Sequence, residues 1–89
     1  MRNFWTDMDD ASALARAAVL RILLVEKGKQ AKLTQAQLAK KLGWEQSTIS
    51  MLESGQRRIE VIEFMALADV LDFDPVDVIR QLRASRIAL

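Results

Sequence analysis

The apolar residues near the middle of the chain predict two short helices. The side chains that define them recur at a spacing of three or four residues: Leu38, Leu42, Ile49 and Leu52. Because an α-helix turns once every 3.6 residues, each pair lies on one face of its helix, and both faces must point inward. We therefore expect helices over residues 34–42 and 46–54 that cross around a tight turn.

Small and polar residues mark the ends of these two helices. Thr34 can cap the first helix through its hydroxyl, and Ala39 allows a close approach of the second. Gly43 follows the first helix directly and Gly55 follows the second, where a chain leaving a helix commonly needs a positive φ. An N-cap, a helix, a glycine turn and a second helix follow one another over residues 34–54, and this order is typical of a helix-turn-helix motif.

The rest of the chain also has helical patterns. We expect a long apolar first helix from about Asp7 to Lys27 with Thr6 as its cap, then a basic loop, GKQAKL, before Thr34. A fourth helix is expected over 60–71, and a fifth from Pro75 to about Arg83 or beyond, with Asp74 as its cap. The prediction is one all-α, five-helix domain over 1–89, with an N-terminal arm at 1–6 and a C-terminal helical tail at 79–89.

The segment from Leu33 to about Leu82 resembles the XRE (Cro and phage-repressor-like) DNA-binding domain. The resemblance is carried by L-T-Q-x-x-L-A, the glycine corner, S-T-I-S-x-x-E-x-G and a later L-A-x-x-L, which occur in this order and spacing. It implies a lambda-repressor-like helix-turn-helix fold and double-stranded DNA as the partner. In that family Glu53 would be structural rather than catalytic. A fold alone does not establish what it binds.

The outward face of the second motif helix carries short, uncharged hydrogen-bonding groups that suit base edges. The residues expected to read bases are Gln46, Ser47, Ser50 and Met51. Gln46 can pair bidentately with adenine, whereas Ser47 can serve either bases or phosphate. Met51 can contact a thymine methyl group or pack at the rim of the core. Glu45 departs from the family, because its charge suits a helix N-terminus but repels phosphate.

A second set of residues is expected to contact DNA phosphates. Its members are Lys32, Thr34, Gln35, Thr48, Arg57 and Arg58. In the family, the glutamine after the threonine binds the backbone beside the helix N-terminus, and the loop after the recognition helix grips phosphate. The alternatives are a solvated amide at Gln35 and solvated or internally paired charges at Arg57 and Arg58.

Charge and composition narrow the function. The net charge of the 89 residues is only +1, but residues 15–58 carry nine basic and three acidic residues, whereas 59–78 carry six acidic residues and no basic one. This polarity can present one side to phosphates. Histidine and cysteine are both absent, so the usual catalytic and metal-binding constellations are missing, and we expect no enzyme, no metal and no cofactor. We also expect no membrane span and no export signal, and therefore a cytoplasmic protein.

These observations predict a sequence-specific DNA-binding transcriptional regulator, most simply a repressor. The apolar residues of the first helix and the tail exceed what one small domain can bury, so a homodimer on a pseudo-palindromic operator is expected. The alternative is a protein-interaction module that has kept the fold, such as an antiactivator or an antitoxin binding a partner protein. The low net charge, Glu45 and the acidic segment keep that alternative open.

Overall fold

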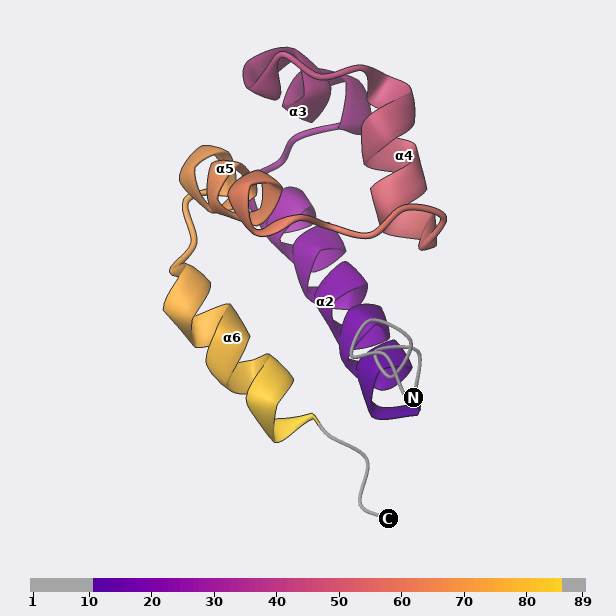
Figure 1. The fold of residues 1–89 in the computed structure, drawn as a ribbon. Helices are drawn as coiled ribbons and strands as arrows, with labels where there is room; N and C mark the ends of the chain where they lie inside the picture. Colours follow the sequence, from indigo (N-terminus) through magenta and orange to yellow (C-terminus); the bar gives the residue numbers. More distant parts are fainter. Residues whose placement is uncertain (1–10, 86–89) are drawn as a thin grey trace.

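A computed structural model describes residues 11–85, which form five helices and no strand (Figure 1). The helices are α2 (Ala11–Gln30), α3 (Gln35–Leu42), α4 (Gln46–Ser54), α5 (Val61–Leu71) and α6 (Pro75–Ala84). The all-α architecture predicted from the sequence is confirmed. The expected arm at 1–6, the cap at Thr6 and the end of the tail lie outside the described residues.

The first described helix continues beyond its predicted end. We expected it to stop near Lys27 and a loop to start at Gly28, but α2 runs through Gly28 to Gln30. The helix ends where Lys32 adopts a left-handed conformation, with φ at 59°. The Leu33 amide then donates to the Gly28 carbonyl oxygen and the Lys32 amide to that of Lys29, at 3.2 and 3.0 Å. These bonds satisfy carbonyl groups in the last turn of α2. Gly28 therefore lies inside the last turn of the helix and does not end it.

The motif helix α3 has the predicted cap and corner. The Gln37 amide donates to Thr34 Oγ1, and the Thr34 amide donates to the Gln37 side chain, which completes a capping box. At the other end Gly43 has φ at 71°, and the Trp44 amide reaches back to the Ala39 carbonyl oxygen at 2.9 Å. A residue with a Cβ adopts this φ at a cost, so glycine lets the chain turn sharply from α3 into α4.

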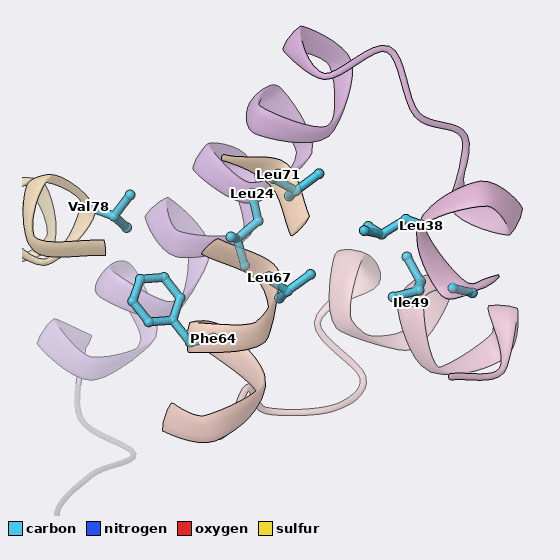
Figure 2. Packing of buried hydrophobic residues seen from close by; sticks show 8 residues of the cluster. Leu24, Leu38, Ile49, Phe64, Leu67, Leu71 and Val78 are labelled. Carbon is cyan, nitrogen blue, oxygen red and sulfur yellow. The ribbon is translucent and has the colours of Figure 1, made fainter. Parts of the chain in front are cut away.

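The core lies where α3, α4, α5 and the first half of α6 meet the C-terminal half of α2 (Figure 2). Its buried apolar members are Leu24, Leu38, Ala39, Ile49, Leu52, Phe64, Leu67, Ala68, Leu71 and Val78. Ile49 and Val78 are the large side chains that are most completely buried. Residues from both motif helices therefore belong to the same hydrophobic core as α5, which holds α3 and α4 at a fixed angle.

The helices α2 and α6 contact each other away from the motif (Figure 1). Asp74 caps α6 by accepting a hydrogen bond from the Val76 amide at 2.9 Å, and Pro75 opens the helix, both as predicted. None of the described helices combines the length and apolar character that crossing a membrane requires. Several large apolar side chains stay exposed on α2, α5 and α6: Leu14, Ile22, Val61, Ile62, Met65, Val76 and Ile79. We expected such a surplus on the first helix and in the tail, but not on α5.

Candidate nucleic-acid interface

One face of α4 is polar and exposed, while the other is part of the core. Ile49 and Leu52 are buried, and Gln46, Ser47 and Ser50 are exposed. The helix enters from Glu45, whose backbone is extended and whose side chain does not cap the first turn. The first turn of α4 therefore presents short hydrogen-bonding side chains from a helix that is anchored on its opposite side, which is the arrangement that base reading needs.

The remaining predicted residues of α4 are less open to solvent. Thr48 and Met51 are each half-buried, so both lie at the edge of the exposed face. The Ser47 hydroxyl lies 3.5 Å from Glu45 Oε2, at the limit of a hydrogen bond. The four expected base-reading residues thus lie along α4, with Gln46 and Ser47 at the end where the helix begins.

The side chain of Gln35 links the two motif helices. Gln35 is half-buried, and its Nε2 donates to Glu53 Oε2 at 2.6 Å. The solvated amide that we considered as an alternative is therefore not what the structure shows. A primary amide carries two hydrogens, so Gln35 can donate one to Glu53 and the other to a second acceptor. This contact agrees with a structural role for Glu53.

Thr34 and Lys32 precede α3 and are both exposed. Thr34 Oγ1 accepts from the Gln37 amide at 3.1 Å, which leaves its own hydroxyl hydrogen free to donate. Lys32 occupies the left-handed position at the end of α2. The short turn between α2 and α3 therefore carries an exposed lysine and an exposed threonine just before the α3 N-terminus, whose amides and dipole favour anions.

Arg57, in the loop after α4, forms a bidentate ion pair with Glu63 of α5. Arg57 Nη1 donates to Glu63 Oε1 at 3.0 Å, and Nη2 donates to Oε2 at 2.6 Å. This hydrogen bonding lowers the pKa of Glu63, against the opposing effect of desolvation, and a hydrogen bond from the Glu60 amide lowers it further. The same pair raises the pKa of Arg57. The loop between α4 and α5 is thereby tied to the start of α5.

The two arginines of this loop differ in their setting. Arg57 is half-buried in its ion pair, which is the internally paired alternative that we considered for it, and Arg58 is exposed. The pair engages two of the five N–H groups of Arg57, so the others can still donate to a phosphate. The ion pair and a phosphate contact are therefore compatible, with Glu63 orienting the guanidinium group.

Three residues of this region escaped the sequence interpretation. Gln37 completes the α3 capping box, and the T-x-x-Q pattern from residue 34 would have indicated it. Glu63 pairs with Arg57 and completes a capping box with Glu60, for which the E-x-x-E spacing was a weak signal. Arg21 of α2 lies against Gly55: a Cβ atom at residue 55 would lie 2.9 Å from Arg21 Cζ. No pattern along the chain indicates that approach, because it depends on how α2 and α4 pack.

The fold and the exposed face of α4 define a DNA-binding protein of the helix-turn-helix class. The helix-turn-helix family model matches residues 26–78, more than half of the chain. The chain belongs to the XRE-type helix-turn-helix family, as its motifs predicted. This is a family of DNA-binding proteins and not of enzymes. Among residues 11–85, no group of acidic side chains is placed to hold a metal ion.

A solved structure supports the same assignment. It is described as an XRE-family like protein from Pseudomonas syringae pv. tomato str. DC3000, and it is 40% identical in sequence to this chain. The two structures superimpose with a TM-score of 0.74 over 79% of this chain and 85% of the other. No curated protein matches the chain.

Proposed function

We propose that the protein is a sequence-specific transcriptional regulator that binds double-stranded DNA as a homodimer and represses by covering a pseudo-palindromic operator. The observation that carries the proposal is the first turn of α4, where Gln46 and Ser47 are exposed on a helix held by Ile49 and Leu52 in the core. A regulator of genomic DNA in a bacterium would act in the cytoplasm. Fluorescence anisotropy with the DNA upstream of its own coding region is the direct test.

The phosphate contacts define a first prediction. Replacing Arg58 or Lys32 by alanine should weaken binding to all DNA sequences alike and reduce the slope of log Kd against log salt by about one unit for each residue. Arg57→Ala should do the same and should also lower stability, because it leaves Glu63 without its ion pair. Titrations at several salt concentrations measure the slope. An unchanged slope in Arg58→Ala would remove that residue from the interface.

A second copy of the chain is the partner that we propose for the exposed start of α5. Val61 and Ile62 are 74% and 77% exposed, and Met65 lies one turn further along the same helix. Such neighbouring apolar side chains are costly to leave in water and are typical of interfaces. Two copies joined there would present two α4 helices to successive major grooves about 34 Å apart, if the pair has the usual two-fold symmetry.

Sedimentation tests the dimer. At micromolar concentration the protein should sediment with twice the chain mass of 10.1 kDa. Ile62→Asp should yield a monomer, because it places a charge in the apolar contact. Ile22→Asp is the matched control, since Ile22 is an exposed isoleucine on α2 rather than α5. A wild-type monomer that still binds one half-site tightly would overturn the dimer proposal.

A protein-interaction module is the second candidate function. The acidic residues on α5, α6 and the turn between them favour it, because they add negative charge beside exposed apolar side chains. An antitoxin or antiactivator would use that side of the molecule against a partner protein. Failure to bind any sequence from the upstream DNA, together with copurification of one stoichiometric partner, would favour this function over repression.

A further inference from the structure

A cleft between α2 and the loop after α4 has the chemistry of a binding site for a small organic anion. Its volume is about 230 Å³. Ala13, Leu14 and Ala17 of α2 form one wall, and Arg57, Arg58 and Ile59 contribute to the other. Ala13 and Ala17 have small side chains, so larger residues at these positions would reduce the space.

The cleft combines positive charge with apolar surface. Arg21, Arg57 and Arg58 all line it. Glu63, which pairs with the Arg57 guanidinium, is not among its described lining residues. Leu14 is 60% exposed beside them, although an apolar side chain of this size is usually covered. Guanidinium groups bind carboxylates and phosphates through paired N–H donors, and the leucine and alanine side chains suit an aliphatic or aromatic body.

The position of Arg21 adds a geometric argument. Its guanidinium group lies over Gly55, which has φ at 81° and whose missing side chain leaves room for it. A Cβ at residue 55 would lie 3.0 Å from Arg21 Nε and 3.1 Å from Nη1, so any larger residue there would displace the arginine. The residue that ends α4 thus also sets the position of a cationic group in the cleft.

We propose that this cleft binds a small carboxylate or phosphate ester with an apolar body, and that binding weakens the affinity for DNA. The volume lies below the range of about 300–1,000 Å³ that is typical of sites for drug-sized ligands, so the occupant is a smaller metabolite. Arg57 and Arg58 line the cleft and are also the proposed phosphate contacts. An anion held by their side chains would therefore compete with the DNA backbone and reduce the affinity for DNA.

Octanoate is a suitable probe, because it joins a carboxylate to an aliphatic chain. It should shift the amide resonances of residues 13–21 and 55–59 in NMR spectra of the full chain. The shifts should saturate with a dissociation constant on the order of 1 mM for a ligand of about ten non-hydrogen atoms. Acetate, which lacks the apolar body, and 1-octanol, which lacks the charge, should leave these resonances unchanged at equal concentration.

Variants separate the cleft from general effects. Ala17→Leu fills the hollow and should abolish the shifts, and Arg21→Gln should weaken octanoate binding by about tenfold. Ala84→Leu is the matched control, because Ala84 is exposed on α6 and does not line the cleft. Shifts that persist in both cleft variants, or that never saturate, would overturn the site.

The effect on DNA is measured separately by anisotropy, and only this part rests on the proposed function. Saturating octanoate should raise Kd for DNA by about fivefold or more relative to equal acetate, and the rise should vanish in Ala17→Leu. Saturable octanoate binding with an unchanged Kd for DNA would overturn the regulatory role. A chain that binds octanoate but no DNA would overturn the proposed function and leave the site standing.

Discussion

Replacing Ile49 by alanine should destabilise the protein by about 2–5 kcal/mol, the cost of deleting a large aliphatic side chain from a packed core. Ile49 is only 2% exposed and belongs to the cluster that joins α4 to α3 and α5. Domains of this size are commonly stable by only about 5 kcal/mol or somewhat more, so the loss removes much of the stability. Thermal unfolding followed by circular dichroism should show a melting temperature lower by roughly 10 °C or more.

The control for this prediction is Ile22→Ala. Ile22 is 59% exposed on α2, so the same chemical change there should alter stability by no more than about 0.5 kcal/mol. Because Ile49 supports the exposed turn that carries Gln46 and Ser47, its loss should also reduce specific DNA binding before the protein unfolds completely. Equal melting temperatures for the two variants would show that α4 does not depend on the core described here.

The helices that the sequence predicted well are those with local end signals. Thr34, Gly43, Gly55 and Asp74 each cap or end a helix through contacts within a few residues, and all four act as expected. The predicted end of α2 was wrong. Gly28 suggested that the helix stops there, but the chain turns at Lys32, whose backbone adopts a left-handed conformation. A positive φ is uncommon for a residue other than glycine, and here the hydrogen bonds of the Lys32 and Leu33 amides to α2 accompany it. The amino-acid sequence alone does not reveal these bonds.

The candidate site shows the same division. The exposure of Gln46, Ser47 and Ser50 followed from the helical period of their neighbours, because a face opposite buried residues must be outward. The pairs Gln35 with Glu53 and Arg57 with Glu63 were not predicted. The first joins residues of α3 and α4 that are 18 positions apart in sequence. The second depends on the path of the loop from α4 into α5. Periodicity places residues on faces, but only packing brings two such faces together.

These two pairs bear on how the interface is held. Gln35 and Arg57 are proposed phosphate contacts. A carboxylate on a different helix orients each of them: Glu53 of α4 for Gln35, and Glu63 of α5 for Arg57. A side chain that is already ordered loses less conformational entropy when it binds. If Gln35 and Arg57 contact phosphates as proposed, Glu53 and Glu63 would also place negative charge near the DNA. These two glutamates would then reduce the affinity somewhat while fixing the geometry of the contacts.

Gln46→Ala should cost about 1–3 kcal/mol of binding free energy on the cognate operator, or about 5- to 150-fold in Kd. Gln46 is exposed in the first turn of α4, where its amide can donate to and accept from one adenine at the same time. Binding to a scrambled duplex should change little, because phosphate contacts supply non-specific affinity. Anisotropy with both duplexes at one salt concentration measures the difference.

The matched control is Gln81→Ala, since Gln81 is an exposed glutamine on α6, away from the motif. The free energy of unfolding of both variants should stay within about 0.5 kcal/mol of the wild-type value, because neither side chain lies in the core. Equal losses on cognate and scrambled DNA would assign Gln46 to a phosphate instead of a base. No loss on either duplex would favour the protein-interaction function, because an exposed amide in the first turn of α4 would then have no part in binding DNA.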